Sequence, residues 1–559
     1  MIIVNFIAFI LVIGVIILVH ELGHFITAKK AGVKCSEFSI GMGPIIKQWQ
    51  KDETTISLRW IPLGGYVQMV DGNESDLYID LDKELGINLD ESGNVKEIIL
   101  DNRISADVVG ICKRKELKSI HGEDLELDLE VDGVINTYAV LSNASYVFSK
   151  SERMELVPYE RSFDSKKIWQ RLIILFAGAL MNFILGLVLC IIASFWRGVP
   201  NYDSNVVGNV EESYPAFKMA GLQKGDEIEG FIYNGKTYEI KTWNDISNKL
   251  GQIYKEDSYP AFNIVYKRNG EVNTSSLVRP YVYIYNTGIT SANAENYENK
   301  SSVEGVVVGK VAIEYDSDGD KIHEGDIITE IRVDKWDANK KNYVESSFEA
   351  VSNWNDIVDK LSSVDAAQVY FKFLSRSEEN GVVTYSDVKT TKSITTYSEE
   401  VLRAQNVVKV QYLLGIEPAY HIDFKGCLSN ALAECGSYFS LVVRTLKVLI
   451  APSNGARTIG LNNMSSVVGI FGMVKNALSA GPQAFLFFVA MLSINIGIMN
   501  LLPIPALDGG RIVFVLYEAI TRRKPNKKFE TYLTLIVYVL LIILFIYITS
   551  NDIRRLIGR

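Results

Sequence analysis

The pentad His20-Glu21-Leu22-Gly23-His24 carries the clearest chemistry in the sequence. Residues four apart lie on the same face of a helix, so the two imidazoles can bind one metal ion. The glutamate after the first histidine can act as general base toward a water molecule at that metal. The spacing therefore predicts a hydrolytic site with Zn2+ as cofactor, with Glu21 as the catalytic residue. Chance is the alternative, and it is disfavoured because the chain contains only 5 histidines.

The residues before the pentad place this chemistry in a membrane. Ile2–Val19 contains no charged residue and is long enough to span most of a bilayer. It lacks the basic start of a signal peptide, and cleavage would discard the pentad. We therefore predict a retained transmembrane helix over residues 1–28.

Further apolar segments predict three more spans, over residues 168–197, 484–511 and 530–550. A fifth candidate, residues 424–452, contains Glu434, Arg444 and Lys447. A charge at the bilayer centre costs about 3 kcal/mol, so this segment is predicted to be an amphipathic or membrane-surface helix. The expected fold class is a multi-pass α-helical membrane protein with four transmembrane helices, and five is the alternative.

Composition and flanking charges predict the topology. The net charge of −9 argues against a nucleic-acid partner. Lysines and arginines gather after the first span, before the second, and between the third and fourth. Such residues favour the cytoplasmic side, which places residues 29–167 inside and residues 197–483 outside. We expect a cell-membrane protein with its active site near the cytoplasmic side.

The outer region contains an internal repeat. Its landmarks recur in order: Val206–Val210 with Val307–Val311, Gly225-Asp226 with Gly325-Asp326, and Trp243-Asn244-Asp245 with Trp354-Asn355-Asp356. The repeat resembles the PDZ domain of bacterial membrane proteases, which predicts α+β PDZ-like domains over residues 203–300 and 301–400. Such domains either bind peptide ends by strand addition or shield the membrane site, and the sequence leaves both open.

The inner region has two predicted parts. Residues 29–70 combine short apolar strands with Gly41, Gly43, Gly64 and Gly65, and the alternation around residues 54–60 predicts a hairpin strand. Residues 71–167 are acidic, and apolar and polar residues alternate in short stretches of this segment. This pattern predicts a β-rich cytoplasmic insert, to which we assign no catalytic or binding role.

A catalytic zinc needs a third protein ligand and one open position. His323 and His421 lie in the outer region, and His121 lies in the insert. Asp508 ends a long apolar run at prolines and glycines, and an acidic residue at membrane depth predicts a functional site. The alternative is that Asp508 only caps the following helix.

Four motifs together resemble the site-2 protease family: HELGH at 20–24, Gly-Gly-Tyr at 64–66, AGALMNF at 177–183 and NLLPIPALDGGR at 500–511. The similarity is to the bacterial sigma-factor-regulating branch with tandem PDZ domains, and it covers all but the acidic insert. Two departures are the length of that insert and the missing Gly-Pro after residues 461–466.

The resemblance implies an intramembrane zinc metalloprotease that cuts transmembrane segments. His20, His24 and Asp508 would hold Zn2+, and Asn500, Gly41, Gly43 and Asn182 would bind substrate. Residues 29–70 would form a membrane-associated β-element. Implied partners are single-pass membrane proteins such as anti-sigma factors, signal peptide remnants, peptide ends at the PDZ domains, and membrane lipid. A non-catalytic PDZ scaffold and an intramembrane metal transporter are the competing functions.

Overall fold

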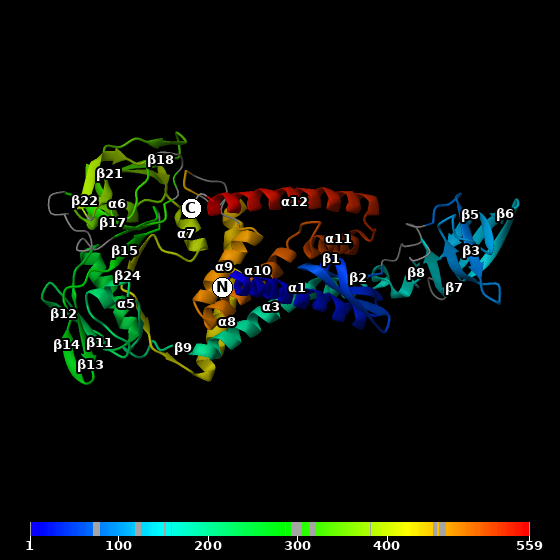
Figure 1. Ribbon diagram of the computed structural model, residues 1–559, viewed down its shortest axis with the longest axis horizontal. Coiled ribbons are helices and arrows are strands. Elements are labelled where there is room, and N and C mark those ends of the chain that lie inside the picture. The colour runs from blue at the N-terminus through cyan, green and yellow to red at the C-terminus, as the bar shows by residue number, and fades with distance from the viewer. Residues whose placement is uncertain are drawn as a thin grey trace. The chain divides into compact units, whose positions relative to one another are not determined.

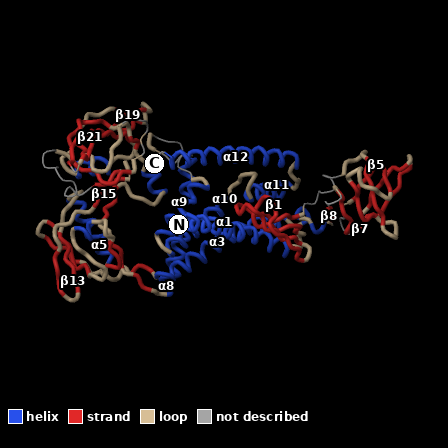
Figure 2. Tube along the Cα trace, viewed as in Figure 1, coloured by secondary structure: helices blue, strands red, loops and turns tan. Residues whose placement is uncertain are grey.

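The computed structural model forms two compact units, Met1–Cys190 with Ser465–Arg559, and Ile191–Met464. Many of their helices and strands are labelled in Figure 1, and Figure 2 colours the chain by type of secondary structure. The residues described are 2–70, 79–117, 125–149, 153–157, 159–285, 287–291, 304–313, 315, 320–380, 382–450, 455–457 and 465–557.

Six helices carry the membrane part of the first unit: α1 (Ile2–Lys30), α3 (Ile168–Arg197), α9 (Val467–Ser479), α10 (Pro482–Asn500), α11 (Asp508–Thr521) and α12 (Lys527–Ile557). Among the described residues, 4 helices are long and apolar enough to cross a membrane, namely α1, α3, α10 and α12. This confirms the predicted number of candidate spans.

The first span packs against the C-terminal helices. Phe9, Val12 and Ile16 of α1 are buried in one cluster with Val474 of α9 and Val489 of α10. Lipid tails are as apolar as these side chains, so close packing rather than the hydrophobic effect holds such helices together. The cluster joins the beginning and the end of the chain around the first span.

The predicted span over residues 484–511 is two helices rather than one. Helix α10 ends at Asn500, and α11 begins at Asp508 after a tight turn. A Cβ at Gly509 would lie 2.2 Å from the Leu502 oxygen, and one at Gly510 would lie 2.3 Å from the Ile504 oxygen. The two glycines therefore let the turn fold back onto the start of α11.

Between the first two spans, β1 (Cys35–Lys51) and β2 (Thr54–Met69) bend to form a small antiparallel sheet. Residues 37–40 pair with residues 55–58 on one side and with residues 65–68 on the other. In the described pairing, residues 65–69 have a partner on one side only. The sheet therefore ends in a strand whose outer edge is open.

The insert that follows is β-rich, as predicted. Its strands are β3 (Glu84–Leu89), β4 (Val95–Ile99), β5 (Val108–Glu116), β6 (Glu126–Val131), β7 (Val134–Val147) and β8 (Arg153–Glu155). Strand β4 pairs with β7 as well as with β3, so the sheet closes on itself around a core that includes Ile87, Leu127 and Tyr146. His121 lies outside the described residues.

The second unit contains two α+β modules. The first module consists of β10 (Val207–Val210), α4 (Pro215–Lys218), β11 (Glu227–Tyr233), β12 (Lys236–Glu239), α5 (Trp243–Glu256), β13 (Asn263–Arg268), β14 (Glu271–Thr274) and β25 (Ile416–Pro418). The second module consists of β15 (Tyr281–Ile284), β16 (Ile289–Ser291), β17 (Val306–Val311), β18 (Ile327–Asp337), β19 (Asn342–Val344), β20 (Glu349–Ala350), α6 (Trp354–Ser362), β21 (Ala367–Glu379), β22 (Val382–Thr390), β23 (Ile394–Thr395), α7 (Glu399–Ala404) and β24 (Val410–Leu413). Two short strands, β9 (Val199–Pro200) and β26 (Tyr420–His421), pair beside the end of α3, where the amphipathic segment begins as helix α8 (Phe424–Ile450).

The repeated landmarks have the same local structure in both modules. The amides of Val207 and Val308 donate to the carbonyls of Asp226 and Asp326, at 2.8 and 2.9 Å. Helices α5 and α6 both begin at a tryptophan behind a capping box, in which an Asp three residues after the cap returns a hydrogen bond. The sequence repeat is therefore a structural repeat.

The two modules are nested rather than consecutive. Strand β25 follows the second module in sequence but pairs with β10, which belongs to the first. Leu414 is 7% exposed and lies in the first module's hydrophobic core. The predicted module ranges ended at residue 400 and so excluded β25, which completes the first module.

We expect Leu414→Ala to destabilise the first module by about 2–5 kcal/mol, because it removes a buried side chain. Hydrogen exchange of the β11 and β13 amides in the full chain measures this loss. Val408→Ala is the matched control, since Val408 is 60% exposed. Equal protection of these strands in both variants would show that the return segment does not complete the core.

Candidate metal centre

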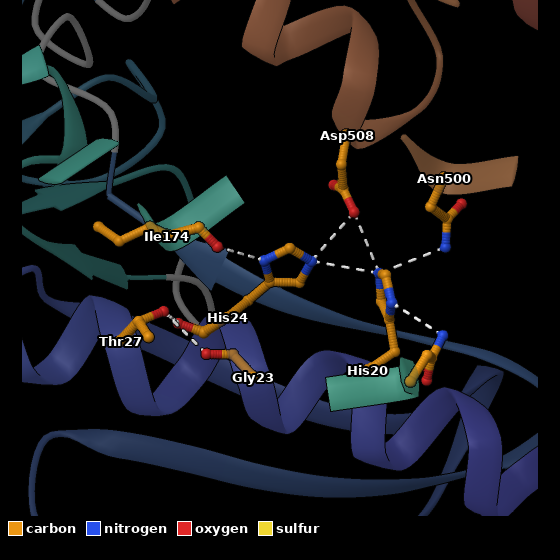
Figure 3. Close-up of polar contacts among 8 residues, drawn as sticks. His20, Gly23, His24, Thr27, Ile174, Asn500 and Asp508 are labelled. Atoms are coloured by element: carbon orange, nitrogen blue, oxygen red, sulfur yellow. Dashed lines mark hydrogen bonds and ion pairs between the residues drawn. The ribbon is translucent and has the colours of Figure 1, made fainter. Parts of the chain in front are cut away.

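Helix α1 presents His20 and His24 on one face, as their spacing predicts. Their Nε2 atoms lie 3.2 Å apart, and both imidazoles are buried. Figure 3 shows the two rings turned toward each other above the helix. Two nitrogen ligands are thus presented from a single turn of a transmembrane helix.

Asp508 joins them from a segment nearly five hundred residues away in sequence. Its Oδ2 lies 3.1 Å from Nε2 of His20 and 3.2 Å from Nε2 of His24 (Figure 3). The N-cap of α11 is Leu507, which makes no side-chain cap hydrogen bond. The capping alternative for Asp508 is therefore wrong, because its carboxylate is directed at the imidazoles.

The three atoms suit a zinc ion. Bonds of about 2.0 Å in tetrahedral geometry separate ligand atoms by roughly 3.3 Å, close to the observed triangle. Among the described residues this is the one group of three or more His, Cys, Asp or Glu side chains close enough to share a metal. Three protein ligands leave the fourth position open, as in catalytic zinc sites.

Polar groups lie behind both imidazole rings, and one of them selects the tautomer that ligation needs. Nδ1 of His24 donates to the Ile174 carbonyl at 2.8 Å, which leaves its Nε2 lone pair free. Nδ2 of Asn182 lies 3.3 Å from Nδ1 of His20, and Oδ1 of the same amide is buried without a hydrogen-bond partner. Turning this amide over would bring Oδ1 to the ring, where it would accept the Nδ1 proton and free Nε2 of His20 as well.

Asn182 is therefore placed differently from its sequence prediction as a substrate-binding residue. Its side chain is 0% exposed, so it orients a ligand ring and has no surface for substrate. Asn500 fits its predicted role better. Its Nδ2 lies 3.4 Å from Nε2 of His20, at the end of α10 and beside the ligand triangle (Figure 3).

Helix α3 comes very close to α1, and the rings fit beside it because Gly178 has no side chain. A Cβ at Gly178 would lie 2.3 Å from Nε2 of His24 and 2.7 Å from Cε1 of His20. A Cβ at Gly23 would lie 2.4 Å from the Ala177 oxygen. Both glycines lie in the motifs singled out from the sequence, although their packing role could not be predicted from one chain.

An ion pair holds the helix of Asp508 against α3. Arg171 Nη2 lies 2.9 Å from Oε1 of Glu518, and the two side chains are only 5% and 17% exposed. Breaking a buried pair of this kind costs about 3–5 kcal/mol. The pair therefore fixes α11, and with it the third ligand, relative to the helix that backs the histidines.

Glu21 faces a different neighbour, the β1–β2 sheet. A Cβ at Gly65 would lie 3.2 Å from Cγ of Glu21, so the open-edged strand passes directly beside the predicted base. Gly41 and Gly43 have φ values of +89° and +82° and form the bend of β1. Gly41 also lines a small cavity shared with Glu21.

A polar network that sequence reasoning missed stabilises this bend. Glu37 accepts hydrogen bonds from Ser57, from Arg59 at 2.7 Å and from the Tyr66 hydroxyl at 2.7 Å. Arg59 also donates to the Gly43 carbonyl at 2.8 Å. Burial opposes ionisation of Glu37, but these hydrogen bonds outweigh it and lower the pKa of its carboxyl, while Glu37 raises the pKa of Arg59. The signal available in the sequence was the pair of opposite charges, Glu37 and Arg59, on two strands of the predicted hairpin.

Gly178→Ala tests the close approach without changing any ligand. We expect zinc affinity to fall about 10- to 100-fold, as for other changes behind metal ligands, because the added methyl group displaces both rings. Metal analysis and competition with a chelator measure this. Gly14→Ala is the control, since a Cβ there meets no atom within 4 Å. Undiminished zinc affinity in Gly178→Ala would contradict the described geometry.

Comparisons with known proteins agree with this site. The family model described as Peptidase family M50 matches residues 8–544. "Putative zinc metalloprotease SACOL1281" of Staphylococcus aureus (strain COL) is 29% identical over 99% of this chain and 98% of its own length. "Zinc metalloprotease RasP" of Shouchella clausii (strain KSM-K16) is 27% identical over 98% of both chains. With the model matching nearly the entire sequence, the chain belongs to peptidase family M50, the family of site-2 proteases.

Proposed function

We propose that this intramembrane zinc metalloprotease hydrolyses peptide bonds within single-pass transmembrane segments, such as those of anti-sigma-factor-like proteins or remnant signal peptides. The observation that carries the proposal is the convergence of His20, His24 and Asp508 inside a bundle of spanning helices. Family membership decides against a non-catalytic scaffold and against a metal transporter.

Substrate must first become extended. A transmembrane helix hides its peptide bonds, because each carbonyl is hydrogen-bonded within the segment. The open edge of residues 65–69 supplies unpaired backbone groups that can bind an unwound segment as an added strand. Since Gly65 lies against Glu21, a strand bound there runs past the catalytic side chain.

The chain's own residues then divide the chemistry. When bound by His20, His24 and Asp508, zinc lowers the pKa of water and polarises a carbonyl. Glu21 removes the proton of the attacking water and later delivers it to the leaving amine. The Asn500 amide, beside the ligand triangle, donates a hydrogen bond to the oxygen that becomes negative.

The proposal also assigns each part of the chain to one side of the membrane. We place the β1–β2 sheet and the insert in the cytoplasm and the two modules outside, because basic residues flank the inner segments. We assign both modules as PDZ-like domains. Support comes from the Gly-Asp turn and the capped helix that recur in each. They bind peptide ends or limit which substrates approach the membrane site.

Glu21→Gln should lower cleavage of a transmembrane peptide by at least about 10²-fold while zinc content stays at one per chain, because the glutamine keeps the shape but cannot accept a proton. Asp508→Asn should lose zinc and activity together. Zinc analysis of the purified variants is compared with single-turnover cleavage. Appreciable activity in Glu21→Gln would remove Glu21 from the mechanism.

Cysteine accessibility tests the proposed sides. In a cysteine-free background, Val134→Cys in the insert and Val272→Cys in the first module introduce thiols at positions 60% and 61% exposed. A membrane-impermeant maleimide added to intact cells should label residue 272 and spare residue 134 until the cells are permeabilised. The reverse pattern would invert the topology.

A further inference from the structure

A small cavity lies between α1 and the β1–β2 sheet, next to the catalytic glutamate. Its volume is about 40 Å³. Helix α1 contributes Gly14, Ile17 and Glu21, and the sheet contributes Gly41, Leu58 and Arg59 among others. Four of its lining residues are glycines, so much of its wall is backbone.

The one cation in the wall is already neutralised. Arg59 donates to the Gly43 carbonyl, to Glu37 and to the Tyr66 hydroxyl, at 2.8, 2.7 and 2.8 Å. Its charge is therefore balanced by Glu37, and the cavity offers no free cation to an anionic ligand. Ile17, Ile40 and Leu58 contribute apolar side chains, and Glu21 and Ser39 are the other polar residues of the wall.

Size limits what the cavity can hold. One water molecule needs about 10–15 Å³ of such space, so 40 Å³ accommodates roughly three non-hydrogen atoms. Alanine, serine, cysteine and valine side chains meet this limit. Leucine and phenylalanine side chains exceed it.

The position of the cavity relates it to a bound strand. Side chains of a strand alternate between the two faces, so every second side chain of an added strand faces α1. The cavity opens between α1 and the sheet, with Glu21 in its wall, and Gly65 in the same wall belongs to the open-edged strand.

We propose that this cavity is the subsite for one substrate side chain beside the cleaved bond, and that it admits only small side chains. The proposal rests on the proteolytic function proposed above. In this proposal, α1 and the β1–β2 sheet determine which peptide bond of a transmembrane segment is cleaved.

The test changes the size of the cavity in the full-length, zinc-loaded enzyme. Model transmembrane peptides carry Gly, Ala, Leu or Phe in turn at each residue flanking the cleaved bond. Gly14→Leu obstructs the cavity, since a Cβ at Gly14 meets no atom within 4 Å and the rest of the leucine side chain exceeds the cavity volume, and Leu58→Ala enlarges the cavity. Gly472→Leu is the control, because Gly472 is a helical glycine with equally open surroundings in α9.

At one flanking position the unaltered enzyme should prefer Ala over Leu and Phe by at least about tenfold in kcat/KM, since one methylene changes kcat/KM by about 10- to 200-fold. Leu58→Ala should raise cleavage of the Leu peptide about tenfold, a gain that misfolding cannot produce. Gly14→Leu should lower cleavage of the Ala peptide relative to the Gly peptide, and Gly472→Leu should change neither ratio.

Two failures are distinguishable. An active enzyme whose preferences are the same in Gly14→Leu, Leu58→Ala and Gly472→Leu overturns the subsite and leaves the protease function standing. A zinc-loaded enzyme that cleaves none of the peptides overturns the proposed function, and the subsite with it.

Discussion

Three polar ligands must meet inside a helix bundle, and the close approach of α1 and α3 makes this possible. The two spans reach this separation because Gly23 and Gly178 lack side chains, since any larger residue there would occupy the space of Ala177 or of the imidazoles. Small residues commonly allow such approach between membrane helices. Here the same residues that let the helices pack also leave room for the metal ligands, so stability of the bundle and geometry of the site depend on one contact.

Several polar groups in this apolar interior are held in defined partnerships, although Nε of Arg171 and Oδ1 of Asn182 lack a hydrogen-bond partner among the described residues. The Ile174 carbonyl and the Asn182 amide each contact one histidine ring, and Arg171 neutralises Glu518. Unpaired, such groups would cost several kcal/mol each away from water. The Ile174 carbonyl leaves Nε2 of His24 facing the other two candidate ligands, and the Arg171–Glu518 pair holds α11 against α3. The requirement for satisfied polar groups is thus what gives the centre its precision.

Local patterns revealed part of this arrangement. The histidine pair was predictable because residues four apart lie on the same face of a helix. Asp508 was predictable because an acidic residue is energetically costly in an apolar segment and therefore suggests a functional site. Arg171 and Glu518 were not predictable as a pair, since 347 residues separate them and neither sequence environment is unusual. The return of β25 to the first module was missed because a strand of 3 residues leaves almost no pattern in the sequence. Asn182 was misassigned because a motif identifies a residue but not the direction in which its side chain points.

The nesting of the two modules affects how the chain can be made. Val207 pairs with Pro418, which a ribosome reaches 211 residues later (418 minus 207). At 5–20 residues per second this is a delay of roughly 10–40 s, much longer than a small domain usually needs to fold. During that interval the first module exposes the edge of β10 and lacks Leu414 in its core, while the second module gains its strands one after another, the last of them, β24, just before β25. The newly made protein therefore passes through a stage with one nearly complete module and one unfinished edge, at which aggregation and chaperone binding would concentrate.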